Sequence, residues 1–178
     1  VNWNAISGRK EGLLGVIAYK VGMASVLAKD LTPNSLTKDK KVFFPVSILE
    51  IPAMKIFSVR FYKNGIVMKD ILVGEDKELK RIVKLGKDKI DYKKLDNVKD
   101  YDDIRVIVYS LVKKTGVKKT PDLAELALSG SLEEKLKFVK ENAGKEILPS
   151  AVLKEEGMVD VRGLTKGKGL SGPVKRFG

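Results

Sequence analysis

The sequence contains no cysteine and no histidine among its 178 residues. These absences exclude thiol nucleophiles, disulfides, thiolate metal sites, histidine-based triads and histidine-ligated zinc. No stretch approaches the roughly 18–20 consecutive apolar residues that span a bilayer, and no signal-peptide pattern opens the chain. We therefore expect an intracellular, cytoplasmic protein with no membrane partner, and we predict neither a metal site nor a cofactor.

Positive charge is in excess, because 35 lysines and arginines stand against 23 acidic residues and give a net charge of +12. The length suits one domain, and a 43% hydrophobic content suffices for a core. Residues 121–150 are net acidic, whereas no acid follows Asp160 and five cations do: Arg162, Lys166, Lys168, Lys175 and Arg176. A basic, acid-free tail is typical of polyanion binding, although charge alone leaves a solvated, flexible C-terminus as an alternative.

Short apolar runs rich in Val, Ile and Phe predict a mainly β core. Asn64 and Gly65, followed by an apolar run at 66–68, are typical of a two-residue hairpin turn, because both tolerate positive φ. The alternation over residues 56–61 predicts one buried face and one wet face. The predicted strands are residues 13–21, 42–51, 54–62, 104–112 and 159–162, with a turn at Gly22 and a loop over residues 28–41.

Helical spacing and capping residues predict α elements beside this β core. Residues 76–85 have the pattern of a short amphipathic helix, and residues 88–103 that of an exposed connection. Thr120 and Pro121 predict the start of a helix that ends near residue 129. Ser131 and Glu134 form a capping-box pattern for a second helix over residues 132–143. We interpret residues 120–146 as a helical insertion in a core of residues 1–162, which the extension 163–178 follows.

The glycine-rich stretch 163–178 reads GLTKGKGLSGPVKRFG. Gly167, Gly169 and Gly172 match G-x-G-x-x-G, but the dinucleotide fold needs a helix after this motif, and Pro173 follows at once. A Walker A motif also fails, because Lys168 occupies the position of its second glycine. The nucleotide-binding interpretation is therefore disfavoured.

The same stretch suits contact with a nucleic-acid backbone. Glycines let a backbone approach a surface closely, while lysines and arginines reach phosphates. Phe177 and Trp3 are candidates for stacking on bases and equally for packing within the protein. The acidic pair Asp102 and Asp103 has no acid–base partner nearby apart from lysine and arginine, and we interpret it as a solvated strand entrance.

Residues 159–178 (VDVRGLTKGKGLSGPVKRFG) closely resemble the signature of the universal large-subunit ribosomal protein L3 family, VDVxGxTKGKGxxGxVKR followed by an aromatic residue. Residues 15–26 (GVIAYKVGMASV) are similar to the family's early strand with its K-x-G-M. Residues 46–54 (VSILEIPAM) resemble the strand ending in E-x-P-P-M, with Ala53 in place of the second proline. The stretch 121–147 resembles the helical insert of the archaeal and eukaryotic branch, and its compactness favours the archaeal type.

The resemblance implies an α+β fold built on a translation-protein-like β-barrel. It also implies a non-enzymatic constituent of the large ribosomal subunit, which binds the ribosomal RNA beside neighbouring ribosomal proteins. Its role would be in subunit assembly and in the organisation of the peptidyl transferase region. The family residues that carry over are Lys166, Gly167, Lys168, Gly169, Gly172, Lys175 and Arg176. Arg162 joins them by charge, Phe177 by stacking and Lys20 by the K-x-G-M match.

Family members begin with a basic arm and continue well past the VKR motif. We therefore expect this chain to be a truncated or split form, whose barrel edge a second chain or RNA covers. Two other functions stay open at this point. One is a non-ribosomal RNA-binding barrel that acts as an assembly module, and the other is an enzyme that binds a phosphate ligand with the glycine loop.

Overall fold

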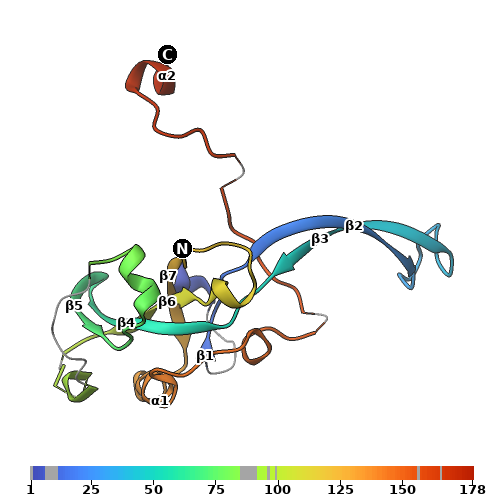
Figure 1. Ribbon diagram of the computed structural model, residues 1–178. Helices are drawn as coiled ribbons and strands as arrows, with labels where there is room; N and C mark the ends of the chain where they lie inside the picture. The colour runs from blue at the N-terminus through green and yellow to red at the C-terminus, as the bar shows by residue number, and fades with distance from the viewer. Residues whose placement is uncertain are drawn as a thin grey trace.

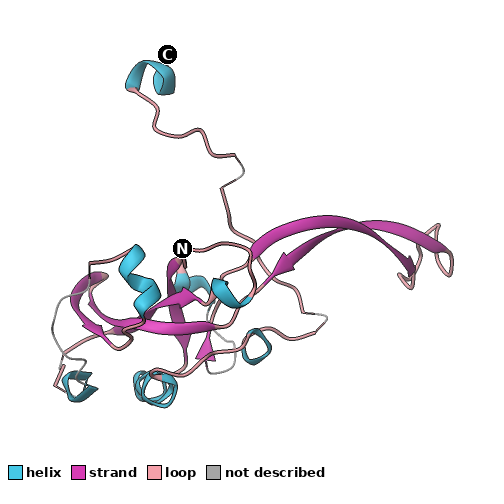
Figure 2. Cartoon of the chain, in the orientation of Figure 1, coloured by secondary structure: helices cyan, strands magenta, loops and turns pink. Residues whose placement is uncertain are grey.

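The computed structural model describes residues 2–6, 12–84, 92–95, 97–98, 100–155, 157–164 and 166–178. Strands dominate, and the helices are short (Figure 2). The strands are β1 (Gly12–Leu13), β2 (Tyr19–Lys29), β3 (Lys41–Glu50), β4 (Met54–Lys63), β5 (Ile66–Leu72), β6 (Asp103–Ser110) and β7 (Leu123–Ser129). The α-helices are α1 (Leu132–Asn142) and α2 (Pro173–Phe177), and the 3-10 helices are η1 (Trp3–Ile6), η2 (Lys77–Arg81), η3 (Tyr92–Leu95), η4 (Val112–Lys114) and η5 (Pro149–Ala151).

Five antiparallel strands form one sheet in the order β1-β7-β6-β4-β5, and β2 and β3 form a separate two-stranded ribbon. We call the five-stranded sheet with α1 and η2 the body. The mainly β architecture with a few helices confirms the predicted α+β class. Within the described residues neither sheet closes on itself, so the predicted barrel closure is not confirmed.

The core occupies both faces of the sheet. Val108 and Tyr109 are neighbours in β6 and therefore point to opposite faces, yet both are buried. Val139 of α1 helps to cover the face of Val108, and Leu79 of η2 covers the face of Tyr109. The larger cluster includes Met54, Ile56, Val59, Phe61, Ile104, Val106, Val108, Leu126 and Leu128. The smaller one consists of Phe57, Leu79, Tyr109 and Leu111.

Two local predictions are confirmed with their geometry. Asn64 and Gly65 have φ of 49° and 76°, and they turn the chain between β4 and β5 as a type I′ hairpin requires. The Ser131 hydroxyl accepts from the Glu134 amide at 3.4 Å, and the Glu134 carboxylate accepts from the Ser131 amide at 2.6 Å. This capping box begins α1, and Gly144 with φ of 72° follows its end.

The helix predicted over residues 121–129 is wrong, because this segment forms β7. β7 pairs with β6 on one side and with β1 on the other. Leu126 and Leu128 are buried in the core from this position. Thr120 and Pro121 are a local signal, and strand pairing with distant residues overrides it. The predicted insertion therefore supplies one strand of the sheet as well as a helix.

The strand predicted over residues 13–21 is interrupted. β1 ends at Leu13, and β2 begins only at Tyr19. Gly22 lies within β2, and the register shifts between Lys20 and Gly22, so the residue predicted to make a turn belongs to a bulge. The loop predicted over residues 28–41 lies between β2 and β3, and β3, β4 and β6 confirm the strands predicted at 42–51, 54–62 and 104–112.

The prediction of a solvent-exposed face in residues 56–61 is also wrong. Ile56 and Ser58 are fully buried, because η2 covers the second face and a bulge between these residues shifts the alternation. The helix predicted at 76–85 is the five-residue η2. Residues 159–162 form no strand and are exposed. The connection predicted at 88–103 lies partly outside the described residues, and within it Leu95 is buried.

The β2–β3 ribbon projects from the body as a long arch (Figure 1). Side chains alternate between its two faces, and the register places only apolar residues and glycine on one of them. We call this the apolar ribbon face. It consists of Gly22, Ala24, Val26 and Ala28 from β2 and Val42, Phe44, Val46 and Ile48 from β3. The opposite face carries Ser25, Lys29, Lys41 and Ser47 among its residues.

Side-chain hydrogen bonds join the root of the ribbon to the body. The Tyr19 hydroxyl donates to Asp122 Oδ2 at 2.6 Å and lies 2.7 Å from Ser110 Oγ. Lys118 Nζ bonds the same carboxylate at 2.6 Å and lies 5.8 Å from the centre of the Tyr19 ring. Burial, and then the hydrogen bond to Asp122, raises the pKa of Tyr19 to about 12. The four residues form a clamp between β2, β6 and the start of β7.

Candidate nucleic-acid interface

The last residues of the chain leave the body as an extended stretch without regular secondary structure, and this stretch ends in α2 (Figure 1). We call residues 157–164 and 166–178 the C-terminal segment. All of its residues are exposed except Ser171, which is half-buried. The segment therefore offers nearly its whole surface to a partner.

The five predicted cations all lie on this segment: Arg162, Lys166, Lys168, Lys175 and Arg176. Within the described part of the chain, none of them forms an ion pair with a carboxylate. The guanidinium carbon of Arg176 lies 5.9 Å from the centre of the Phe177 ring. The segment thus carries positive charge that no acid of the described chain neutralises.

The segment's glycines leave its backbone open. A Cβ added at Gly163, Gly169 or Gly172 would meet nothing within 4 Å, whereas Gly167 has Leu164 at 3.9 Å. Gly169 has φ of 64°, a conformation that other residues rarely adopt. Exposed amides between glycines can approach and donate to a phosphate or sugar without hindrance from side chains.

A five-residue helix does follow the G-x-G-x-x-G match, contrary to the sequence expectation. α2 begins at Pro173, and Lys175 and Arg176 occupy its last turn, where positive charge complements the helix dipole. Residues 159–164 before it form no strand, so the strand–loop–helix unit of a dinucleotide site is missing from this described stretch.

Large apolar side chains alternate with the cations. Leu164, Leu170, Val174 and Phe177 are each at least 82% exposed. Phe177 is therefore accessible for stacking on a base. Trp3, the other aromatic candidate, is half-buried and packs against the core, which makes it a packing residue.

Lys20 lies apart from the other predicted site residues. It is exposed in β2, beside the Tyr19 clamp and at the bulge of the ribbon. No hydrogen bond or ion pair joins it to the described residues of the C-terminal segment. The structure therefore brings nine of the ten predicted residues together on one segment and leaves Lys20 at the root of the ribbon.

Asp102 and Asp103 have structural partners. Asp102 Oδ2 accepts from the Asn64 amide at 2.8 Å. Asp103 accepts from Lys135 of α1 at 2.6 Å and from Arg105 at 3.1 Å. The predicted position at the entrance of β6 is confirmed, whereas the predicted solvation holds for the exposed Asp102 and not for Asp103, which is half-buried.

Arg60 and Arg105 on the sheet differ from the arginines of the segment, because carboxylates pair them. Glu125 accepts from Arg60 at 2.8 Å, from Arg105 at 3.3 Å and from the Tyr62 hydroxyl at 2.7 Å. Burial would raise the pKa of Glu125, but these three hydrogen bonds outweigh burial and hold the pKa below its usual range. Arg60 also donates to Asp70 at 2.8 Å. This network lies on the sheet and leaves little free charge there.

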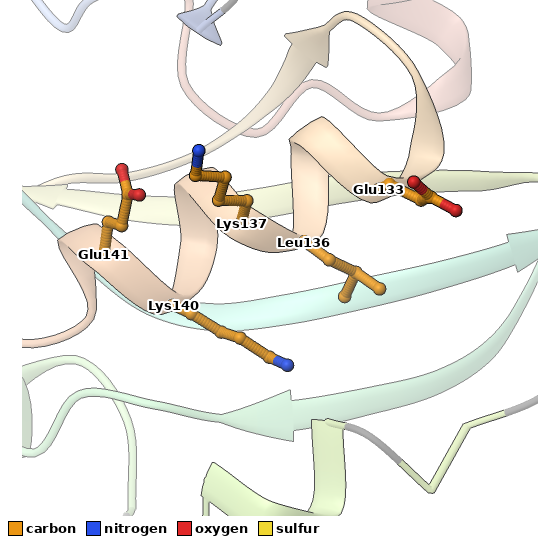
Figure 3. Close-up of a pocket in the computed structure, with 5 residues that line it drawn as sticks. All are labelled: Glu133, Leu136, Lys137, Lys140 and Glu141. Atoms are coloured by element: carbon orange, nitrogen blue, oxygen red, sulfur yellow. The ribbon is translucent and has the colours of Figure 1, made fainter.

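Two hollows of the described surface contain no cluster of acid–base groups aimed at a common point. The larger, of about 460 Å³, is lined by five residues that all belong to α1, and Figure 3 shows their side chains pointing in different directions from that helix. The second, of about 350 Å³, contains one titratable residue, Glu146, which Lys114 bonds at 2.7 Å. Among the described residues, no group of three or more acidic side chains could hold a metal ion.

Sequence reasoning left out one further group of exposed cations. Lys38, Lys40 and Lys41 lie where the ribbon turns back, and within the described ranges none of them has an acidic partner. The run KDKK ahead of a predicted strand is the sequence signal for them, although such a run is also typical of a polar loop.

None of the helices in the described ranges combines the length and the hydropathy of a membrane span. A profile of the family described as ribosomal protein L3 matches residues 60–178. The chain is similar to the large ribosomal subunit protein uL3 of Methanosphaera stadtmanae, with 40% identity over 94% of this chain and 53% of the relative. It is also similar to the uL3 proteins of Picrophilus torridus, with 36% identity over 99% and 55%, and of Methanobrevibacter smithii, with 39% over 93% and 53%.

The chain spans about half the length of these curated relatives. The profile match covers well over half of the chain and includes the whole C-terminal segment. The three relatives extend the similarity to nearly all of the chain. This protein therefore belongs to the ribosomal protein L3 family.

Proposed function

We propose that the chain is a structural, non-enzymatic constituent of the large ribosomal subunit and binds its ribosomal RNA. The observation that carries the proposal is the C-terminal segment, whose five exposed cations form no ion pair with the described residues. The names of the relatives, large ribosomal subunit protein uL3, support the ribosomal setting. In this proposal the protein acts in the cytoplasm, within the ribosome, beside neighbouring ribosomal proteins.

The segment would bind RNA through phosphates and backbone. Lysines and arginines neutralise phosphates and release condensed counterions, which favours association. The open backbone around Gly167 and Gly169 lets the chain enter a narrow space between RNA strands. Phe177 stacks on an exposed base, and this contact adds an apolar component to the binding. The role in subunit assembly and in the peptidyl transferase region follows from such an inserted segment.

We further propose that the body and the ribbon are part of a translation-protein-like β-barrel, which strands outside the described residues complete. The support is the apolar ribbon face, which includes Val26, Phe44 and Ile48, each between 45% and 49% exposed. Burial of such a surface is favourable by about 25 cal/mol per Å². The relatives are about twice as long as this chain, so further residues of the same protein or of a second chain would supply the missing strands.

The division of the chain into residues 1–162 and 163–178 stays a prediction and belongs to this proposal. The body packs a core, whereas the segment packs against almost nothing that the structure describes. In this arrangement the body anchors the protein, and the segment makes the RNA contacts.

Salt dependence tests the proposal. If the five cations engage phosphates, the affinity for large-subunit ribosomal RNA should fall with salt at a log-log slope of about −4 or steeper. The double variant Lys166→Ala/Lys168→Ala should weaken binding and reduce the steepness by about 1.5. The matched control Lys137→Ala/Lys145→Ala removes two exposed lysines of α1 and its C-terminal flank, and it should change neither. A slope near zero in the unaltered protein would contradict the proposal.

Sedimentation separates the ribosomal function from the alternative of an independent RNA-binding module. An integral constituent stays with large subunits in high salt, whereas a module that acts from outside dissociates. Titration with nucleotides addresses the alternative of a phosphate-ligand enzyme, and we expect no binding.

A further inference from the structure

The end of the β2–β3 ribbon is a second concentration of positive charge in the molecule. We call residues 29–41 the ribbon tip. It contains the cations Lys29, Lys38, Lys40 and Lys41 and the acids Asp30 and Asp39. The tip and the C-terminal segment project from the body in different directions (Figure 1).

Both acids of the tip are engaged inside it. Asp30 accepts from the Thr32 amide at 2.9 Å and from the hydroxyls of Ser35 and Thr37 at 2.8 and 2.5 Å. The hydrogen bonds from Thr37 and then from Thr32 hold the pKa of Asp30 far below its usual range. Asp39 forms an ion pair with Lys29 at 2.9 Å. Neither carboxylate is therefore available to neutralise Lys38, Lys40 or Lys41.

The tip also holds like charges together. Lys29 and Lys41 are directly opposite each other in the β2–β3 register. Two cations in such a cross-strand pair repel each other and destabilise a hairpin. Asp39 neutralises Lys29 only, so Lys41 and its neighbour Lys40 stay uncompensated within the described residues. An anion that binds between these side chains would relieve the repulsion.

The tip is ordered by its own hydrogen bonds. The Asp39 amide donates to the Asp30 carbonyl at 2.8 Å, and the Asp30 amide donates to the Lys40 carbonyl at 3.0 Å. Together with the Asp30 side chain, these bonds fix where the lysines leave the backbone. A fixed set of cations loses less conformational entropy on binding than a mobile tail does.

We infer that the ribbon tip is a second RNA-backbone site, in which Lys38, Lys40 and Lys41 contact phosphates at a place distinct from that of the C-terminal segment. The inference rests on the proposed function, because it takes RNA as the polyanion. RNA is favoured over an acidic protein segment, because the proposed function places the chain in the large ribosomal subunit, whose RNA is a polyanion. The protein would then hold folded RNA at two separated points.

Salt titration of the complete chain on archaeal large-subunit ribosomal RNA, transcribed in vitro, tests the inference. Three added phosphate contacts predict a log-log slope of about −6 to −7 for the unaltered protein, against about −4 for the segment alone. The triple variant Lys38→Gln/Lys40→Gln/Lys41→Gln should reduce the steepness by about 2 to 3. A control, Lys137→Gln/Lys145→Gln/Lys154→Gln, removes the same charge from exposed positions of the body side and should leave the slope unchanged.

Directed cleavage locates the contact without altering any lysine of the tip. The chain has no native cysteine, so a single introduced cysteine accepts an iron chelate at one position only. Leu36→Cys places the chelate on the tip and Leu170→Cys on the C-terminal segment, because both leucines are almost fully exposed. Lys137→Cys on α1 serves as the control. We expect the Leu36 and Leu170 positions to cleave the RNA at different nucleotides.

The outcomes separate the two proposals. If the Leu36 position cleaves no more than the α1 control while the Leu170 position cleaves, the tip site is wrong and the proposed function stands. If neither position cleaves, both are wrong. An unchanged salt slope in the triple lysine variant would also contradict the tip site. It would favour a protein partner for these lysines instead. Circular dichroism of each variant verifies that the strands are retained.

Discussion

In the body, arginines lie on the sheet among carboxylates, and Arg60 and Arg105 share Glu125 between them. In the C-terminal segment and at the ribbon tip, cations outnumber the acids, and within the described chain all of these cations except Lys29 lack an ion pair. The body thus packs a core and pairs Arg60 and Arg105 with carboxylates, whereas the two projections expose most of their cations and apolar residues. This difference locates the core in the body and the exposed positive charge of the proposed RNA contacts in the two projections.

Removal of an aromatic ring should give the largest difference in stability between the body and the ribbon. Phe61 is fully buried in β4 and meets Tyr101 edge to face at a centroid distance of 5.0 Å. Phe61→Ala should lower the free energy of unfolding by about 3–5 kcal/mol. Phe43 on the ribbon is 71% exposed, and Phe43→Ala should cost less than about 1 kcal/mol. Urea denaturation followed by circular dichroism measures both, and similar losses would contradict the separation of body and ribbon.

Loss of a paired charge in the body should have the next largest effect. Glu125→Gln leaves Arg60 and Arg105 without their shared carboxylate and should cost about 2–3 kcal/mol. Glu133→Gln, at an exposed position of α1, should cost less than about 0.5 kcal/mol.

The ion pairs of Glu125 should also make the stability of the protein depend on pH. The folded-state pKa of Glu125 is lowered, so its contribution to stability is present above the unfolded pKa, about 4.3, and is lost as the pH falls through the lower folded value. The unaltered protein should therefore lose stability below about pH 4 more steeply than Glu125→Gln does. Parallel acid profiles would show that the network contributes nothing to this dependence.

Two glycines offer a subtler comparison. A Cβ on Gly74, just beyond β5, would lie 2.4 Å from the backbone oxygen of Ile56. Gly74→Ala should therefore cost about 1–3 kcal/mol, since the backbone of β4 would have to move. Gly163 in the segment has open space around it, and Gly163→Ala should leave the thermal midpoint unchanged. A large shift of the thermal midpoint in Gly163→Ala would show that the segment packs against other residues, and it would contradict this prediction.

The smallest effect concerns the junction between body and ribbon. Tyr19→Phe removes the hydroxyl that bonds Asp122 and Ser110, and it should cost about 0.5–1.5 kcal/mol. Because the pKa of Tyr19 is raised to about 12, the clamp's contribution is complete below pH 10 and is lost as the pH rises through about 12. Ultraviolet titration should show that a tyrosine with a pKa near 12 disappears in Tyr19→Phe, and its persistence would contradict the assignment.

The sequence predicted the features that neighbouring residues decide. The turn at Asn64 and Gly65 and the capping box at Ser131 need only residues within one turn of chain, and both are confirmed. β7 was missed because Leu123–Ser129 contains good helix formers, and only pairing with β6 and β1 makes it a strand. Similarly, the second buried face of β4 depends on η2, whose approach no local pattern reveals.

The candidate site stays a prediction, but the exposure of its C-terminal cations could be predicted from composition. No acid follows Asp160, and glycines separate the cations, so neither ion pairs nor a regular packed element were expected there. The ribbon tip was missed because its charge balance in the sequence is modest. Only the hydrogen bonds of Asp30 and the ion pair of Asp39 show that its acids are already engaged.

The pairing of β1 with β7 has a consequence for the order in which the molecule forms. Gly12 pairs with Ser129, so β1 has no sheet partner until more than a hundred later residues have been synthesised. At about 5–20 residues per second, this wait lasts about 6–25 s. The β2–β3 ribbon needs only the turn at residues 30–40 and closes in about 1–10 μs once its strands are available. A nascent chain would therefore present the ribbon to its surroundings many seconds before β1 joins the sheet.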